Sequence, residues 1–251
     1  MIAKRIIACL DIANGMVVKG VKFQNHEAIG EIVEMAERYS KAGVDELVLY
    51  DILASCDEKT VNYKWVEDIA RVINIPFCVA GKIDSIAKIE AILNAGADKI
   101  SINSPAINNP NLIDDIAKRF GTSTIVVGID TKDGKIYKNT GDNSKTQEIE
   151  RSVTTWASEV ASRGAGEIVL NSINSDGTKN GFDIELLAEI SASVKIPVIA
   201  SGGAGSMEHF ADAFQKTSIS GALAASVFHK NEISILELKK YLLEKNICVR
   251  I

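Results

Sequence analysis

The chain has 251 residues, of which 46% are hydrophobic and 6% aromatic, and its formal net charge is −5 at pH 7. This length fits one large α/β domain or two small ones. The net negative charge argues against a protein-wide positive potential that would attract nucleic acid or an anionic membrane. No apolar run approaches the roughly 18 residues of a membrane span, and the N-terminus lacks a signal-peptide core. We therefore expect a soluble, cytoplasmic protein.

Strand and helix patterns alternate along the chain. Short apolar runs predict strands that are buried on both faces, and helical patterns, several of them ended by glycine, separate these strands. In chain order we predict a strand and then a helix at 5–10 and 31–42, 46–51 and 61–73, 75–80 and 84–95, 98–102 and 109–119, 124–130 and 148–163, 167–171 and 183–193, 196–201 and 206–215, and 221–225 and 234–245. The longest irregular stretches all follow strands, at 15–30, 52–60, 131–147 and 172–182.

The second half of the sequence repeats the first. Arg5-Ile-Ile-Ala-Cys-Leu-Asp11 corresponds to Thr124-Ile-Val-Val-Gly-Ile-Asp130, and further matches follow at offsets of 119 to 122 residues. Such a period indicates two copies of one half-structure. Eight β-then-α units in two matching sets predict a (β/α)8 TIM barrel with a twofold half-barrel internal repeat, in preference to an open doubly wound sheet. No linker separates the halves, about 1–122 and 123–251, so we expect one domain over 1–251.

Two aspartates stand out as candidate catalytic residues. Asp11 and Asp130 end equivalent apolar strands of the first and fifth units, which places them on opposite sides of the barrel mouth. Burying a carboxylate is costly unless it is paired or used. The pair suits one acid and one base acting on a substrate from two sides. The plainer alternative is two loop-capping aspartates.

Glycine-rich turns predict two phosphate sites. In the second half a turn follows the seventh strand and a Ser follows the eighth, which is where barrels commonly bind phosphate; the residues are Gly202, Gly203, Ala225 and Ser226. The first half has the matching set Gly81, Lys82, Asn103 and Ser104. Two sites across the mouth predict an elongated bisphosphate ligand, and tight structural turns are the alternative. Further candidate ligand contacts are Lys19, Asp176, Gly177 and Thr178.

Charged residues begin four of the predicted strands. Arg5, Glu46, Lys99 and Glu167 start the first, second, fourth and sixth strands, so their side chains would ring the base of the barrel interior. Opposite charges in such a ring pair with each other and close the axial end. Rim salt bridges that only stabilise the fold are the alternative.

We expect no metal site and no cofactor. The three histidines, at 26, 209 and 229, are scattered and form no ligand cluster. The four cysteines show no Cys-x-x-Cys spacing, and Cys9 and Cys78 fall inside predicted strands, which indicates buried thiols.

These motifs together resemble the cyclase subunit of imidazole glycerol phosphate synthase. The resemblance runs from Ile2 to the C-terminal Cys-Val-Arg-Ile and rests on seven segments: Ala3-Lys-Arg-Ile-Ile-Ala-Cys-Leu-Asp11, Val17-Val-Lys-Gly20, Gly96-Ala-Asp-Lys-Ile-Ser-Ile-Asn-Ser104, Gly164-Ala-Gly-Glu-Ile-Val-Leu170, Asp176-Gly-Thr178, Ile199-Ala-Ser-Gly-Gly-Ala-Gly205 and Ala222-Leu-Ala-Ala-Ser-Val-Phe-His229. A sister isomerase family of the same pathway shares the half-barrel repeat and the aspartate pair. The Ala-Cys-Leu-Asp opening and the Ala-Ser-Val-Phe-His segment look like the cyclase.

The resemblance implies a step of histidine biosynthesis. Ammonia from a glutaminase partner attacks a bisphosphate aminoimidazole carboxamide ribonucleotide adduct, which splits and cyclises to imidazole glycerol phosphate and releases the carboxamide ribotide. Asp11 and Asp130 would be the acid/base pair. The four charged residues at the base would form the ammonia gate, and Asp98 would face the glutaminase in a heterodimer.

Some residues on the mouth differ from the family pattern. The glycine triplet after the third strand is Ala80-Gly81-Lys82 here, and Asn171 and Asn174 replace a Thr and an Asp. Because these differences lie where substrate would bind, they leave open a paralogue that delivers ammonia to another acceptor, such as a nucleotide sugar in surface glycan synthesis. A scaffold that only activates a glutaminase is a third possibility, against which the aspartate pair argues.

Overall fold

The computed structural model describes residues 2–21, 24–52, 61–142 and 144–251, with 19–21 and 24–27 described by their backbone only. Within them, eight parallel strands form a closed barrel, because β7 pairs with β10 as well as with β6. In barrel order the strands are β1 (Arg5–Ala13), β4 (Glu46–Asp51), β5 (Phe77–Ala80), β6 (Lys99–Ile102), β7 (Ile125–Lys132), β10 (Glu167–Ser172), β11 (Val198–Ser201) and β12 (Gly221–Ala224). The predicted (β/α)8 barrel is confirmed.

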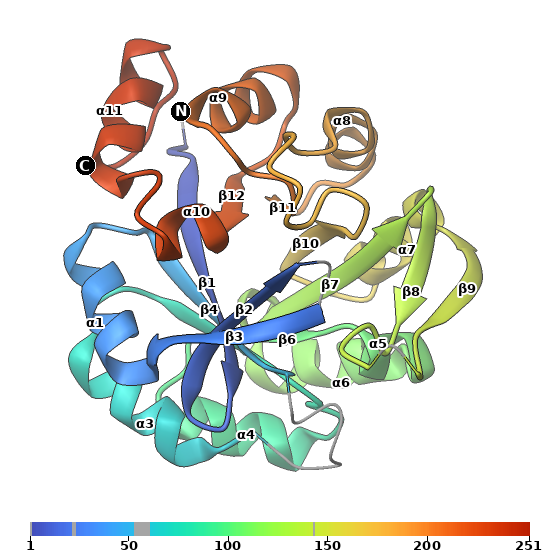
Figure 1. Ribbon diagram of the computed structural model, residues 1–251. Coiled ribbons are helices and arrows are strands. Elements are labelled where there is room, and N and C mark those ends of the chain that lie inside the picture. Colours follow the sequence, from blue (N-terminus) through green and yellow to red (C-terminus); the bar gives the residue numbers. More distant parts are fainter. Residues whose placement is uncertain (1, 22–23, 53–60, 143) are drawn as a thin grey trace.

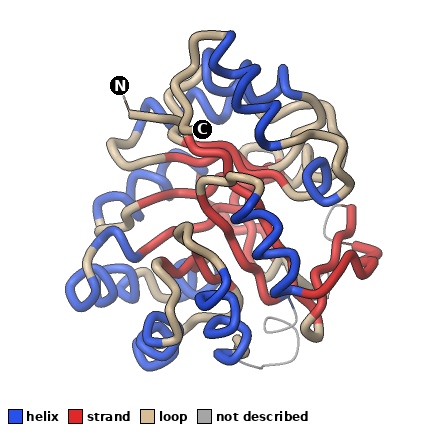
Figure 2. Tube along the Cα trace, turned by 90° about the vertical axis from the view of Figure 1, so that its left-hand side faces the viewer, coloured by secondary structure: helices blue, strands red, loops and turns tan. Residues whose placement is uncertain are grey.

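Helices surround the barrel on its outside (Figures 1 and 2). They are α1 (Ile32–Lys41), α3 (Tyr63–Val72), α4 (Ile86–Asn94), α5 (Ser104–Asn108), α6 (Asn111–Phe120), α7 (Val153–Ser162), α8 (Ile184–Ser193), α9 (Met207–Lys216), α10 (Ser226–His229) and α11 (Ile235–Glu244), with a short 3-10 turn at Thr122–Thr124. None of the helices in the described parts is long and apolar enough to cross a membrane. Residues 53–60 of the predicted irregular stretch 52–60 lie outside the described residues.

Two of the stretches predicted to be irregular contain β-hairpins. β1 runs three residues past its predicted end and pairs with β2 (Met16–Val21), which pairs with β3 (Gln24–Glu31). β7 likewise extends to pair with β8 (Lys135–Lys138), which pairs with β9 (Gln147–Ser152). In Figure 1 the β2–β3 hairpin crosses the front of the barrel and the β8–β9 pair projects at the right. Each half of the repeat therefore carries one hairpin after its first strand.

The turn residues explain the β1–β2 and β7–β8 hairpins. Asn14 and Gly15 follow β1 with φ angles of 51° and 80°, and Asp133 and Gly134 follow β7 with φ angles of 53° and 75°. Two successive residues with positive φ form the type I′ turn that matches the twist of paired strands, and Asn-Gly and Asp-Gly favour it. The prediction that the strands end at the aspartates was wrong for this reason.

The predicted helix 148–163 begins later than expected. Residues 147–152 form β9, and α7 starts at Val153 behind the N-cap Ser152, whose side chain accepts a hydrogen bond from the Thr155 N–H. Ile149 of β9 pairs with Ile136 of β8. This strand pairing outweighs the helical pattern of the charged segment.

The buried side chains form two separate layers. A large cluster fills the space between the barrel and the helices. A smaller cluster lies inside the barrel and consists of Ile7, Cys9, Val48, Cys78, Val126, Val169, Ile199 and Leu223. Since successive residues of a strand point to opposite sides, the inward face of β1 carries Arg5, Ile7, Cys9 and Asp11 in turn. The barrel interior thus has a charged base, an apolar middle and a polar mouth.

Candidate active site

A cavity of about 420 Å³ opens at the mouth of the barrel, at the carboxyl ends of the parallel strands. Both predicted catalytic residues, Asp11 and Asp130, line it, and each is only 8% exposed. A cavity of this size suits a small-molecule ligand. The mouth of a (β/α)8 barrel is also where enzymes with this fold hold their active sites.

Three side chains donate hydrogen bonds to Asp130. Asn103 Nδ2 lies 2.7 Å from Oδ2, Asn171 Nδ2 lies 2.7 Å from Oδ1, and the Thr140 hydroxyl donates to Oδ2. Burial raises the pKa of Asp130 above its usual value, while the bonds from Thr140, Asn171 and Asn103 act against this rise. A carboxylate offers about four lone-pair sites, so these donors, taken among the residues that the structure describes, leave one site open, on Oδ1.

Asp11 has a different environment. It pairs with Val18 of the β2 hairpin and lies beside Tyr50 of β4 in the parallel register. The Cys9 thiol, two residues back on the same inward face, is 3.6 Å from Asp11 Oδ1. Burial raises the pKa of the Tyr50 hydroxyl well above its usual value, with nearby Cys9 and Asp130 adding to the rise. Asp11 therefore has the Cys9 thiol as a neighbour, whereas Asp130 has two amides and a hydroxyl, with the Tyr50 phenol nearby.

The second-half phosphate candidates form a compact cradle beside the cavity. Gly202 and Gly203 have φ angles of 92° and 106°, and a Cβ on them would come within 2.7 Å of the Ser172 carbonyl oxygen and 2.0 Å of the Gly181 carbonyl oxygen. Only glycine fits these two positions. Ser226 begins α10 next to them, and all four predicted residues line the cavity: Gly202, Gly203, Ala225 and Ser226.

The first-half candidates repeat this arrangement with one substitution. Gly81 has a φ of 132°, and its Cβ would lie 2.7 Å from the carbonyl oxygen of Asp51, the last residue of β4. The φ and ψ angles of Asn103 before α5 are −119° and −83°, close to the −123° and −73° of Ala225 before α10. Lys82 occupies the position of the second glycine with a φ of 30°. Gly81, Lys82, Asn103 and Ser104 all line the cavity.

The remaining predicted ligand contacts do not all lie at the cavity. Asp176 and Gly177 line the cavity. The Thr178 hydroxyl instead donates to the Ser175 carbonyl at 2.8 Å, which closes a turn, and Thr178 is not part of the cavity wall. The side chain of Lys19 lies outside the described residues.

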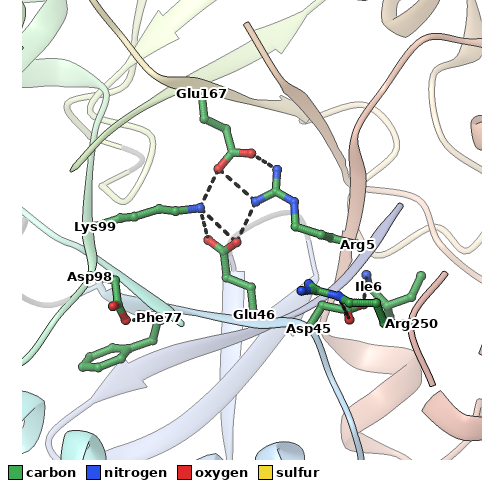
Figure 3. Close-up of polar contacts among 9 residues, drawn as sticks. All are labelled: Arg5, Ile6, Asp45, Glu46, Phe77, Asp98, Lys99, Glu167 and Arg250. Atoms are coloured by element: carbon green, nitrogen blue, oxygen red, sulfur yellow. Dashed lines mark hydrogen bonds and ion pairs between the residues drawn. The ribbon is translucent and has the colours of Figure 1, made fainter. Parts of the chain in front are cut away.

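The four predicted base residues form a closed ring of ion pairs, here called the base ring (Figure 3). Arg5 Nη1 is 2.7 Å from Glu46, and Arg5 also pairs with Glu167. Lys99 Nζ is 2.9 Å from Glu46 and 3.1 Å from Glu167. Burial by itself would lower the pKa of Lys99, but the two carboxylates outweigh it and the pKa is raised. Lys99 is therefore held in its protonated form within the ring.

The base ring and the cavity lie at opposite ends of the same interior. The apolar cluster inside the barrel separates them, and the buried thiols of Cys9 and Cys78 within it form no disulfide. Asp98, the predicted partner contact, precedes Lys99 and is exposed at the base, where its carboxylate accepts a hydrogen bond from the Phe77 N–H at 3.0 Å.

Comparison with known proteins identifies the family. The pattern of the histidine biosynthesis protein family matches residues 5–234. Imidazole glycerol phosphate synthase subunit HisF of Francisella philomiragia is 56% identical over 255 residues, which cover 100% of this chain and 99% of that protein. This chain belongs to the HisF family. The subunits HisF of Vibrio cholerae serotype O1 and Proteus mirabilis are each 55% identical and are covered over their full length.

Family membership makes the chain an enzyme of histidine biosynthesis. The relatives at this identity carry the name of the histidine-pathway synthase, so the nucleotide-sugar alternative that the mouth residues left open receives no support. The differences at Lys82 and Asn171 are therefore variations within a HisF site.

Sequence reasoning missed two of the residues around Asp130. Asn171 was noted only as a difference from the family, and Thr140 lay in a stretch predicted to be irregular. The signal for Asn171 was its position as the residue that ends the sixth predicted strand, beside the strand of Asp130. Thr140 follows β8, so the Asp-Gly turn at 133–134, which predicts the β8 hairpin, was the available signal.

Proposed function

We propose that this HisF-family enzyme forms imidazole glycerol phosphate and aminoimidazole carboxamide ribotide from a bisphosphate ribonucleotide adduct and ammonia, as one subunit of a complex with a glutaminase. The observation that carries the proposal is the pair of buried carboxylates, Asp11 and Asp130, on one cavity above a charged base ring. The relatives' designation as synthase subunits supports a partner.

Asp130 acts as a base through Oδ1 in this proposal. Its other oxygen already accepts bonds from Asn103 and Thr140, and Asn171 occupies one side of Oδ1. These donors hold the carboxylate in a single orientation and oppose the rise in its pKa that burial causes. Asp11 approaches the substrate from the opposite side of the mouth and serves as the complementary acid. Their unlike neighbours are what such a division of roles requires.

The two cradles bind the two phosphates of the substrate. In the second half, Gly202 and Gly203 let backbone groups approach an anion closely. In the first half, Lys82 supplies a positive charge where the second half has glycine. An elongated bisphosphate stretched between the cradles would lie across both carboxylates.

Ammonia enters through the base ring and crosses the apolar interior. The ring repels cations, because its accessible groups are Arg5 and Lys99, each about one-fifth exposed, while its carboxylates are nearly inaccessible. The interior beyond it is lined mainly by aliphatic side chains, which bind a small polar molecule only weakly. Ammonia is thereby delivered to the mouth without release to solvent.

The direct test is turnover of the ribulosyl bisphosphate substrate by the purified chain, with an ammonium salt at alkaline pH. Asp11→Asn and Asp130→Asn should each abolish turnover while the fold is retained. The matched control is Asp133→Asn, at the same rim but bonded to Asn174 rather than lining the cavity, and it should keep near wild-type activity. Absence of turnover in the unmodified chain at every ammonia concentration would refute the proposal.

A further inference from the structure

A buried carboxylate that belongs to neither the cavity nor the base ring joins the two strands that carry Arg5 and Glu46. Asp45 immediately precedes Glu46, and its side chain is 4% exposed. Its backbone N–H donates to the Ile6 carbonyl at 2.9 Å, and its Oδ2 accepts from the Ile6 N–H at 2.8 Å. Ile6 in turn immediately follows Arg5. Two hydrogen bonds therefore join Ile6 to Asp45, and each of these residues is the immediate neighbour of a ring residue, Arg5 or Glu46.

The C-terminal part of the chain holds this carboxylate in place. Lys239 of α11 lies 2.9 Å from Asp45 Oδ1 and also donates to the Gly43 carbonyl at 2.6 Å. The Lys239 side chain is itself 4% exposed. Arg250 Nε adds a contact to Oδ1 at 3.3 Å, and Figure 3 shows it beside Asp45.

A buried ion pair of this kind is weak evidence for stability, because removing two charges from water costs about as much as their attraction returns. Positioning is the better-attested use of such a pair. Here the pair fixes one carboxylate orientation, since both oxygens of Asp45 are engaged by groups from different elements.

The chain provides internal comparisons for this arrangement. Asp98 precedes Lys99 and makes the same pair of hydrogen bonds with Phe77. Its backbone N–H donates to the Phe77 carbonyl at 3.1 Å, and its carboxylate accepts from the Phe77 N–H at 3.0 Å. Asp98 is exposed, however, and makes no ion pair with any residue that the structure describes. Gly166 precedes Glu167, where a Cβ would come within 2.1 Å of the Thr122 carbonyl oxygen, so no side chain can act there. Of these three junctions, as far as the structure describes their contacts, that of Asp45 alone is tied to a distant helix.

We propose that Asp45 and Lys239 are a positioning pair for the base ring, through which α11 sets the register of Arg5 against Glu46. This inference rests on the proposed role of the ring in ammonia entry. Loss of the Lys239 charge leaves Asp45 buried beside Ile6, so the carboxylate turns toward Arg250 and solvent and the Arg5–Glu46 contact loosens. Ammonia transfer from the partner then becomes less efficient, while the cavity at the other end of the barrel is unchanged.

The test compares glutamine-dependent with ammonium-dependent turnover of the complex for Lys239→Met, which keeps side-chain length and removes the charge. The ratio of the two rates should fall by about five-fold or more, because misplacing a positioned group by about 1 Å can reduce a rate by up to roughly 100-fold. Lys239→Arg, which keeps the charge, should restore much of the ratio. Lys64→Met, which breaks an exposed ion pair with Asp68 within the outer helix α3, should leave it unchanged.

A second measurement does not depend on the reaction. In Lys239→Met, NMR should show a displaced Arg5 side-chain N–H resonance and amide exchange at Ile6 that is roughly ten-fold faster. If Lys239→Met does not fold, Asp45→Asn takes its place, since the amide oxygen still accepts from Ile6. An unchanged ratio together with unchanged Arg5 and Ile6 signals overturns the positioning role. Changed signals with an unchanged ratio, also in Glu46→Gln, support the positioning and refute ammonia entry through the ring.

Discussion

Replacing Asn171 by alanine tests the assignment of Asp130 as the base. The substitution removes the only hydrogen bond that the structure shows to Asp130 Oδ1, from Asn171 Nδ2 at 2.7 Å. A hydrogen bond to a charged group contributes about 1.5–3 kcal/mol, and one pKa unit corresponds to about 1.4 kcal/mol. Because the lost bond favours the ionised form, the pKa of Asp130 should rise by about 1–2 units.

The assay is the pH dependence of kcat/KM, with free ammonia held constant at each pH. The acid limb should move to higher pH by about 1–2 units. Asn171→Thr retains a donor and should restore part of the shift. Asn174→Ala removes a comparable bond, to Asp133 at 2.8 Å on the same rim, and should leave the limb in place. A limb for Asn171→Ala that coincides with that of the wild type would refute the reasoning.

The same substitution should also change how the free energy of unfolding depends on pH. Burial already raises the pKa of Asp130 above its usual value, so the stability associated with this group is present below the usual pKa and is lost as the pH rises through the raised one. Asn171→Ala raises the folded-state pKa further. Its destabilisation relative to the wild type should therefore be largest at neutral and alkaline pH and should shrink in acid, as urea unfolding would measure.

Three more substitutions have outcomes set by the structure. Lys99→Met leaves both carboxylates of the base ring to a single guanidinium and should lower the free energy of unfolding by about 3 kcal/mol, measured with urea; an unchanged midpoint would contradict a buried ring. Gly166→Ala places a Cβ 2.1 Å from the Thr122 carbonyl oxygen and should destabilise by about 3 kcal/mol or more. Its control, Gly43→Ala at a φ of 81° with open space around it, should lose only about 1 kcal/mol. Lys82→Gly should raise KM for the bisphosphate about ten-fold with kcat retained, if the lysine binds phosphate; a lower KM would exclude that role.

Sequence periodicity was enough to predict the barrel. Each of its eight strands is buried on both faces, so each appears in the sequence as a short apolar run, and the repeat fixed how the runs correspond. The base ring was also predictable, because the first residues of parallel barrel strands all lie at the same end of the barrel. Charged residues at these positions are therefore close to one another. Arg5 and Glu167 are far apart in the chain but share this position.

The surroundings of Asp130 could not be predicted in the same way. Thr140 reaches the carboxylate only because the β8 hairpin folds back over the mouth, and its distance from Asp130 along the chain gives no indication of this contact. The hairpins themselves left a usable signal. Asn14-Gly15 and Asp133-Gly134 are turn pairs separated by the same 119 residues as the two aspartates. The repeat thus extends to segments whose polar composition indicated irregular loops.

The parallel register gives the two carboxylates unlike neighbours at equivalent positions, since Asp11 lies beside Tyr50 and Asp130 beside Asn171. A perfectly twofold mouth would accept an elongated ligand with different ends in either direction, and the reversed complex would be a dead end. With three hydrogen-bond donors on Asp130 and a thiol beside Asp11, only one direction of binding presents each reacting atom to its matching group. The site thereby has a polarity that its half-barrel repeat alone would not supply.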